Sequence, residues 1–344
     1  LKIAMIGAGS LVFTRRLLLD LVVVPELSDT HFAFMDIDEE FLNNVTQVCR
    51  RDIEANGWDA TITPTLDRRE AIADADYVVT MIRQGGLEGY VHDIDIPLKY
   101  GVDQCVGDTL CAGGITYAQR IIPEILAIAE DTAELAKPNA LLMNYANPMA
   151  MISWALNRYS KVRSVGLCHG VEGGFSQICS VLGVPEEETS YICAGVNHQT
   201  WYLSVKHRGE ELTGKLVAAF EGHETAPTTE KVRIDVLRRF GHYSTESNGH
   251  LSEYLPWYRK RPDELGDWIA MDKWSQGETG GYLRISREGR RRYIEKFPEI
   301  LAEPPAIFEK VNPYRSKEHF SYIVEAEHTG RLYRGHFNVE NQGY

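Results

Sequence analysis

The sequence of 344 residues predicts an α/β fold: a doubly wound parallel sheet, followed by a smaller α+β domain. Three observations lead to this expectation. Short apolar runs alternate with segments of helical period, and the first run, Lys2–Ile6, ends in the glycine-containing stretch Gly7–Ser10. After residue 187 the pattern changes to alternating apolar and polar residues, which is typical of antiparallel strands.

The expected elements of the first part alternate regularly along the chain. Strands are predicted at residues 2–6, 31–35, 61–65, 77–82, 140–144 and 162–167. Helices are predicted at residues 11–24, 41–57, 69–75, 117–136 and 150–159. Six strands joined by helices in this order are typical of a Rossmann-type sheet, as in lactate and malate dehydrogenases.

The second part is expected to fold as an α+β domain that binds substrate and metal. Two strands are predicted, at residues 191–197 and 200–209, followed by helices rich in aromatic and charged side chains. We therefore expect one boundary near residue 190, with an NAD-binding domain at 1–190 and a second domain at 191–344.

Composition excludes several classes of protein. The formal charge of −13 disfavours nucleic acid and anionic lipid as partners, because both carry negative charge. The N-terminus lacks the pattern of a signal peptide, and no apolar run approaches the length of a membrane span. Six cysteines spread through the chain do not form a disulfide framework, so a reducing cytoplasm is expected, in which a thiol can bind metal.

The first turn is a candidate cofactor site. Gly7 and Gly9 would allow a tight turn and close approach of a pyrophosphate to the helix that begins after Ser10. Asp36 ends the second predicted strand, where a carboxylate would bind the ribose hydroxyls of NAD. Val12 replaces the third glycine of the usual fingerprint. Alternatively, the glycines only make a turn and Asp36 only caps the next helix.

A second candidate site follows the last strand of the predicted sheet. Cys168 and His169 lie at the carboxyl edge, where open α/β folds bind ligands, and His198 follows the next strand-like run. A thiolate and an imidazole form part of a metal site whose open positions substrate oxygens could fill. From spacing alone, a buried cysteine and a hydrogen-bonded histidine explain these residues better than a metal site does.

The ordered motifs resemble those of glycoside hydrolase family 4, the NAD- and metal-dependent glycosidases. They are GAGS, MDID, VGDTLCAGGI, NYANPMA, GLCHGV, AGVNH and TESNGHLSEYLPW, and they extend over essentially the whole chain. The α-galactosidase, or melibiase-like, branch is the most similar. The resemblance also implies that the second domain continues beyond a strand near residues 335–343 and beyond Tyr344.

The resemblance implies an unusual glycosidase reaction. In this family NAD⁺ takes hydride from C3 of the sugar, a base removes the C2 proton, the aglycone leaves, water adds, and the hydride returns. A divalent metal, for which we expect Mn²⁺, would bind the sugar hydroxyls and polarise the C3 carbonyl. Nicotinamide and metal would therefore meet at one sugar ring.

The same resemblance assigns roles to individual residues. Cys168 and His198 would hold the metal, and His169 would help to protonate the departing oxygen. Asn147 would contact both the substrate hydroxyls and the nicotinamide region. Asn197 would contact substrate, unless it serves only the turn.

Two further roles have structural alternatives. Asp108 would orient the metal-bound hydroxyls, or else form a loop turn. Arg315 would reach the sugar, or else form a surface salt bridge.

The base that removes the C2 proton has three candidates. We favour His250, because the pKa of an imidazole lies near the operating pH. Tyr243 and Tyr254 are the other two, since some relatives use a tyrosine, although helix packing explains both.

Substrate choice is expected to depend on Cys168–Val171. The phosphoglycosidases of the family have Cys-Asn-x-Pro here, so a 6-phosphosugar is disfavoured. Gly170 stands where the α-galactosidases usually have serine, and this leaves room for a glucoside, a uronide or another C6-acidic sugar.

Two alternatives outside the family remain. An NAD-dependent hydroxyacid dehydrogenase would release free NADH, and an NAD-binding sensor would need no metal. The sequence also leads us to expect a homo-oligomer, a dimer or a tetramer, with no nucleic acid or membrane partner.

Overall fold

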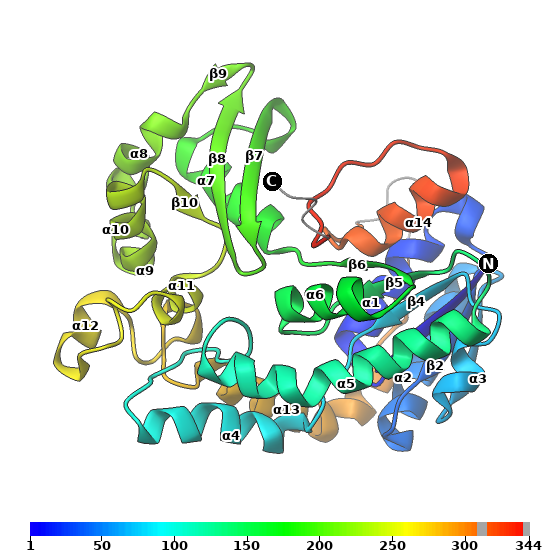
Figure 1. Ribbon diagram of the computed structural model, residues 1–344. Helices are drawn as coiled ribbons and strands as arrows, with labels where there is room; N and C mark the ends of the chain where they lie inside the picture. The colour runs from blue at the N-terminus through cyan, green and yellow to red at the C-terminus, as the bar shows by residue number, and fades with distance from the viewer. Residues whose placement is uncertain (308–314, 340–344) are drawn as a thin grey trace. The chain divides into compact units, whose positions relative to one another are not determined.

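The computed structural model describes residues 1–307 and 315–339 (Figure 1). The chain forms two units, each assembled from separate parts of the sequence. The first unit takes residues 1–84, 120–168 and those from 291 onward, and the second takes 85–119 and 169–290. This division differs from the single boundary expected near residue 190, because the chain passes between the units more than once.

The first unit contains the expected parallel sheet. Its strand order is β3-β2-β1-β4-β5-β6, with every neighbouring pair parallel. The strands are β1 Lys2–Ile6, β2 His31–Met35, β3 Thr61–Thr65, β4 Tyr77–Thr80, β5 Leu141–Asn144 and β6 Arg163–Gly166. The order reverses between β1 and β4, and open sheets of this type bind ligands at such a point. The predicted Rossmann-type fold is therefore confirmed.

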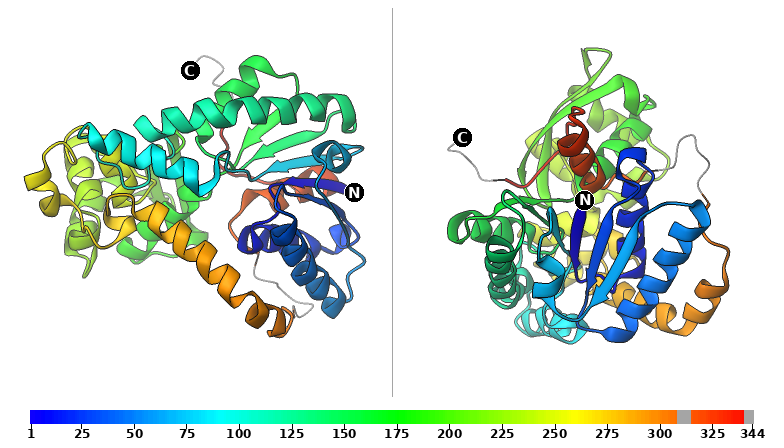
Figure 2. Two further views of the ribbon diagram at one scale, coloured as in Figure 1. Left: turned by 90° about the horizontal axis from the view of Figure 1, so that it is seen from below. Right: turned by 90° about the vertical axis from the view of Figure 1, so that its right-hand side faces the viewer.

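Helices cover both faces of this sheet. They are α1 Leu11–Val22, α2 Glu39–Asn56, α3 Arg68–Ile72, α5 Ala112–Leu135, α6 Met149–Tyr159, α13 Gly281–Ala302 and α14 His319–Thr329. Helices α1 and α2 lie on one face, and α5 and α6 lie on the other (Figure 2, left). Alternate residues of β1 such as Ile3 and Met5 are fully buried against the face that packs with α1 and α2.

Local sequence explains where α2 begins and ends. The Asp38 side chain accepts a hydrogen bond from the N–H of Phe41 and so caps the first turn. Gly57 follows the last residue with a φ of 65°, which glycine adopts without steric cost. The expected helix at 41–57 therefore begins two residues earlier than predicted.

The second unit is built around a small antiparallel sheet, as expected. Strand β8 pairs with β7, β9 and β10. The strands are β7 Thr189–Val196, β8 Gln199–His207, β9 Glu210–Glu211 and β10 Tyr243–Ser244. Its core contains Phe175, Tyr202, Phe220 and Tyr243, all buried.

Most helices of the second unit are short. They are α4 Gly86–Lys99, α7 Gly170–Leu182, α8 Leu216–Gly222, α9 Ala226–Thr229, α10 Lys231–Phe240, α11 Asn248–Tyr254 and α12 Leu265–Trp268. The five 3-10 helices of the described residues are η1 Pro25–Leu27, η2 Glu186–Glu188, η3 Thr213–Lys215, η4 Pro262–Glu264 and η5 Trp274–Gln276. Helix α4 was not predicted from the sequence, and it carries Pro97 in its last turn.

Two further expectations concern the chain as a whole. Near the end of the described residues, Asn338 forms an isolated bridge with Gly166, and the end of the strand expected at 335–343 lies outside them. Among the described residues, no helix combines the length and the apolar character that crossing a bilayer requires.

Candidate active site

A pocket of about 310 Å³ in the first unit lies at the carboxyl ends of its strands. It is lined by residues that follow β1, β2 and β4 and by one side of α5. They are Ile6, Gly7, Ser10, Met35, Asp36, Ile37, Arg68, Met81, Ile82, Arg83, Gln84, Glu124 and Ile128. Three of the residues predicted to bind the cofactor, Gly7, Ser10 and Asp36, are among them.

The turn after β1 requires its first glycine. Gly7 has a φ of 93°, and its N–H donates to the carbonyl oxygen of Met35 at 2.9 Å. A Cβ at this position would lie 2.9 Å from the backbone of Met81. Both conformation and space therefore exclude a larger residue here.

The second glycine lies against the acid that ends β2. The N–H of Gly9 donates to Asp36 Oδ2 at 2.7 Å, and a Cβ on Gly9 would lie 2.8 Å from the same oxygen. Asp36 Oδ1 accepts from the N–H of Asp38 at 3.0 Å. The carboxylate thus fixes the turn and also lines the pocket, so the structural and the binding interpretations of Asp36 are compatible.

Two apolar side chains complete this region. Ile37 lines the pocket with 90% of its surface exposed, which offers an apolar contact for a ligand. Val12, which stands in place of the third glycine, is 69% exposed on α1 and needs no close packing.

Asn147 follows β5 in a turn that a different asparagine organises. Buried Asn144 accepts from Thr80 Oγ1 at 2.8 Å and from the N–H of Ala146 at 3.1 Å. Asn147 itself is half-buried and does not line the pocket described above. Its proposed contacts with substrate and nicotinamide stay a prediction.

Three side chains form a candidate metal centre. The Sγ of Cys168, a ring nitrogen of His198 and a carboxylate oxygen of Glu246 all lie within 4.8 Å of one another. Two ligands on opposite sides of one ion lie about 4–4.6 Å apart, so one divalent ion fits this group after small adjustments.

His198 is presented by the tip of the β7–β8 hairpin. Asn197 and His198 form its two-residue turn, in which His198 has a φ of 65°. Its Nδ1 lies 3.0 Å from Thr109 Oγ1, and this hydroxyl donates to Asp108 Oδ1 at 2.9 Å. A ring nitrogen with an orienting partner of this kind is usual for a histidine that binds a metal.

Asp108 is therefore linked through Thr109 to His198, a candidate metal ligand. Both Asp108 and Thr109 are fully buried. The sequence predicts that Asp108 orients metal-bound hydroxyls of the substrate, a role that stays a prediction. Thr109 was not identified from the sequence, since a threonine in a loop has no distinctive pattern.

A buried carboxylate holds the loop that carries these two residues. Glu253 accepts from the N–H groups of Cys105, Val106 and Gly107 at 2.7, 2.8 and 3.0 Å. Burial raises the pKa of Glu253 to about 7, against the lowering effect of these hydrogen bonds. Sequence reasoning also missed Glu253 and Glu246, although both flank His250 in the segment TESNGHLSEYLPW.

His250 lies next to His198. Their ring centroids are 5.1 Å apart, and His250 Nδ1 lies 2.7 Å from Oγ of Ser247, which caps α11. Burial lowers the pKa of His250 to about 4, so the imidazole is neutral near pH 7 but is a weaker base than the sequence argument assumed. The ring of Tyr254, another candidate base, has its centroid 6.2 Å from that of His250.

Among the buried polar atoms of the second unit that lack hydrogen-bond partners within the described residues, two belong to residues predicted to lie in the site. They are Oδ1 of Asn197 and the hydroxyl of Tyr254. Unsatisfied buried polar atoms are rare in native proteins, and a bound ligand is one explanation for them. His169, at the start of α7, is exposed.

Tyr243 and Arg315 have structural partners. Tyr243 is fully buried, stacks on Phe220 with ring centroids 4.1 Å apart, and donates to Gln177 Oε1 at 3.0 Å. Arg315, in the first unit, pairs with Glu325, and its guanidinium lies 3.9 Å from the ring centroid of Tyr322. These contacts favour the packing and salt-bridge alternatives for the two residues.

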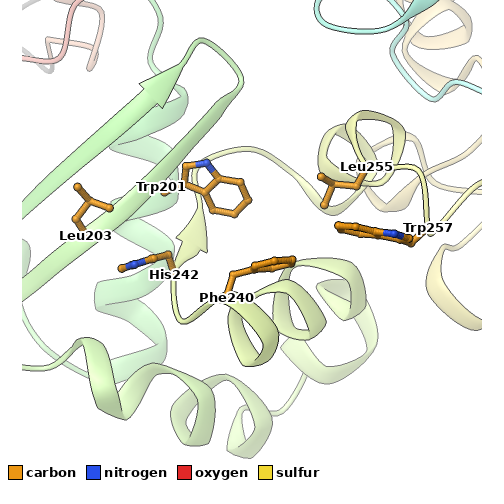
Figure 3. A pocket seen from close by; sticks show the side chains of 6 residues that line it. All are labelled: Trp201, Leu203, Phe240, His242, Leu255 and Trp257. Carbon is orange, nitrogen blue, oxygen red and sulfur yellow. The ribbon is translucent and has the colours of Figure 1, made fainter. Parts of the chain in front are cut away.

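A separate apolar pocket of about 470 Å³ lies in the second unit (Figure 3). It is lined by Trp201, Leu203, Phe240, His242, Leu255 and Trp257. Phe240 and Trp257 stack with ring centroids 6.0 Å apart, and each is more than half exposed. None of the predicted site residues lines this pocket.

Comparison with known proteins identifies the family. A model of the family 4 glycosyl hydrolases matches residues 2–184, and a model of the C-terminal domain of this family matches residues 193–344. An alpha-galactosidase of Rhizobium meliloti (strain 1021) is 55% identical over 343 residues, covering 99% of this chain and 70% of that protein. An alpha-galactosidase of Bacillus subtilis (strain 168) is 31% identical, covering 99% of this chain and 77% of that protein.

Solved structures share the fold at lower identity. A 6-phospho-alpha-glucosidase from gut microorganisms, in complex with NAD and glucose-6-phosphate, has a TM-score of 0.77 at 22% identity, covering 98% of this chain and 77% of that chain. A 6-phospho-beta glucosidase from Thermotoga maritima, with manganese, NAD⁺ and glucose-6-phosphate, has a TM-score of 0.69 at 23% identity, covering 94% and 71%. Since the two family models together match nearly the whole sequence, the chain belongs to family 4 of the glycosyl hydrolases.

Proposed function

We propose that this chain is an α-galactosidase that acts on non-phosphorylated galactosides with NAD and a divalent metal, Mn²⁺. The observation that carries the proposal is the identity of 55% with an alpha-galactosidase over 99% of the chain. The solved relatives that contain NAD and manganese support the choice of cofactors.

The residues of the first unit suit a dinucleotide. The strand-to-helix turn offers backbone N–H groups at the start of α1, and Gly7 and Gly9 leave it without side chains. Asp36 lines the same pocket, and each of its oxygens retains capacity for a ribose hydroxyl. Bound NAD would supply reversible hydride transfer at C3 of the sugar.

The residues of the candidate metal centre suit a borderline divalent ion. A thiolate, an imidazole and a carboxylate are ligand types that bind first-row divalent metals. The ion would supply Lewis acidity toward the sugar oxygens. The unpartnered Oδ1 of Asn197 lies on the residue next to His198, and it would accept a hydrogen bond from a sugar hydroxyl.

We assign removal of the C2 proton to Nε2 of His250. In the tautomer whose Nδ1 donates to Ser247 Oγ, Nε2 carries the lone pair and can accept a proton. His169 is assigned the protonation of the departing oxygen, and its exposure agrees with exchange of that proton with water. Tyr243 is not given a role, because its hydroxyl already donates to Gln177 within the core.

The sequence around Cys168 supports a non-phosphorylated sugar. The segment Cys168–Val171 lacks the Cys-Asn-x-Pro pattern of phosphoglycosidases. A 6-phosphosugar is therefore the less favoured substrate.

The experiment is a panel of nitrophenyl glycosides assayed with NAD⁺, Mn²⁺ and a thiol reductant. The panel contains both anomers of galactosides and glucosides, with uronic, C6-sulfonated and 6-phosphorylated sugars. We expect hydrolysis of the α-galactoside, loss of activity with a chelator, and no accumulation of NADH. Preference for a uronide would contradict the substrate, and NADH release without glycoside cleavage would favour a dehydrogenase.

Two properties of the whole protein stay predictions. We infer a homo-oligomer, which sedimentation velocity would test. We also infer a cytoplasmic location, supported by the state of the six cysteines, which are thiols and not disulfides. Cell fractionation would test the location.

A further inference from the structure

We propose that Glu246 is a third protein ligand of the metal, and that Gly170 is the residue that admits its carboxylate. The inference rests on the proposed function, because that proposal supplies the metal. It adds to the cysteine and histidine a ligand that the sequence motifs did not identify. Glu246 lies in the loop between β10 and α11, and its oxygen belongs to the group within 4.8 Å described above.

Gly170 and the carboxylate of Glu246 approach each other closely within the second unit. A Cβ built on Gly170 would lie 1.8 Å from Oε1 of Glu246 and 2.8 Å from its Cδ. Real Cβ atoms never come this close, so any side chain at position 170 would force the carboxylate away. The position of the Glu246 carboxylate therefore depends on the absence of a side chain at Gly170.

The backbone does not require glycine at this position. Gly170 is the first residue of α7 and does not have a left-handed φ, unlike Gly7 or Gly183. A residue with a side chain could adopt this conformation without backbone strain. The contact with Glu246 is thus the feature of the structure that explains glycine at position 170.

The surroundings of Glu246 suit a carboxylate that faces a cation. The titratable and charged groups around it include Cys168, Tyr254, Arg233 and the three histidines His169, His198 and His250. The guanidinium of Arg233 is held by Glu230 at 3.0 Å and by the carbonyl oxygen of Ser244 at 2.7 Å. Its charge is therefore largely compensated by other partners.

Charge and ligand type decide which ion would bind. A thiolate and a carboxylate together carry two negative charges, which a divalent ion neutralises. A carboxylate oxygen is a hard ligand that favours ions such as Mn²⁺ over ions that prefer sulfur. Three protein ligands on a six-coordinate ion still leave positions for two sugar hydroxyls.

The test measures binding of Mn²⁺ alone to the chelator-treated full chain, without NAD or substrate. Electron paramagnetic resonance reports the free ion, so the dissociation constant follows from a titration. The variants are Glu246→Gln, which keeps the shape and removes the charge, and Gly170→Ser, which displaces the carboxylate. The matched control is Gly173→Ser on the same helix, where an added Cβ meets nothing within 4 Å.

We expect Glu246→Gln and Gly170→Ser each to weaken Mn²⁺ binding by about tenfold or more, and Gly173→Ser to leave it unchanged. The double variant Gly170→Ser/Glu246→Gln should bind no more weakly than either single variant, because both changes remove the same ligand. Unchanged affinity for NAD⁺ would show that each variant is folded.

Three results would overturn the inference. The first is unchanged Mn²⁺ affinity in a folded Glu246→Gln variant. The second is weaker Mn²⁺ binding in Gly170→Ser when Glu246→Gln binds like the wild type. The third is additive losses of affinity in the double variant. Failure of the wild-type chain to bind Mn²⁺ would instead overturn the proposed function. The two failures are therefore distinguishable.

Discussion

The two candidate binding regions of this chain are constructed from different parts of the polypeptide. The candidate dinucleotide turn is made by neighbouring residues, Gly7 to Ser10, and the first and last of them line the pocket. The candidate metal centre takes one side chain from each of three distant segments, at Cys168, His198 and Glu246. A contiguous site depends mainly on local conformation, whereas a dispersed site depends on packing.

The strongest test of the dispersed site is His198→Ala. Loss of this imidazole should lower glycosidase activity by about 1000-fold, equivalent to about 4 kcal/mol of transition-state stabilisation. Steady-state kinetics with Mn²⁺ and NAD⁺ would measure it, and binding of NAD⁺ should be unchanged. Near-normal activity in this variant would remove the metal centre from the mechanism.

The contiguous site is tested by Gly7→Ala. Its positive φ and the backbone of Met81 at 2.9 Å both oppose a side chain, so we expect NAD⁺ to bind about 100-fold more weakly. Gly57→Ala is the matched control, since Gly57 also has a positive φ but an added Cβ there meets nothing within 4 Å. Fluorescence titration measures both variants, and equal affinities would contradict the role of the turn.

Features formed by residues close in sequence could be predicted more fully than the site whose residues are brought together by packing. The parallel sheet and the tight turn at Gly7–Ser10 follow from local periodicity and from a motif of four residues, and both were predicted. Cys168 and His198 were proposed as ligands from family resemblance, because spacing alone also allowed a buried thiol and a packed histidine. Glu246 and Glu253 could not be identified, because only the packing of separate segments shows which acid of a polar segment lies near the candidate site.

A smaller effect is expected at Thr109, which links Asp108 to His198. Thr109→Val keeps the shape and removes the hydroxyl, so Nδ1 of His198 loses its partner at 3.0 Å. We expect about tenfold weaker binding of Mn²⁺, with little change in stability. Thr109→Ser keeps the hydroxyl and should bind Mn²⁺ like the wild type. Equal Mn²⁺ affinities of the Thr109→Val and Thr109→Ser variants would exclude this orienting role.

The raised pKa of Glu253 should make the free energy of unfolding depend on pH. Its pKa is about 7 in the folded chain and about 4.5 in an exposed one, so the folded state binds the proton more tightly. The free energy of unfolding from this group therefore falls as the pH rises from about 4.5 to about 7. Glu253→Gln should remove this slope in urea titrations at several pH values, and an unchanged slope would contradict the assignment.

The smallest effect on activity is expected for a substitution of Tyr243, which the family resemblance identified as a possible base. Tyr243→Phe removes the hydrogen bond to Gln177 but keeps the ring on Phe220 and beneath the guanidinium of Arg233. We expect activity within about threefold of wild type and a loss of about 1 kcal/mol in stability, the usual value for one buried hydrogen bond.

His250→Asn is the comparison for this variant, because it removes the imidazole assigned to the C2 proton. Kinetics with a C2-deuterated galactoside distinguish the two residues, since the isotope effect reports the step in which that proton moves. A large loss of activity in Tyr243→Phe with normal stability would transfer the base to the tyrosine. Such a result would also mean that a side chain in the core of the second unit must move during turnover, because its hydroxyl is buried in this structure.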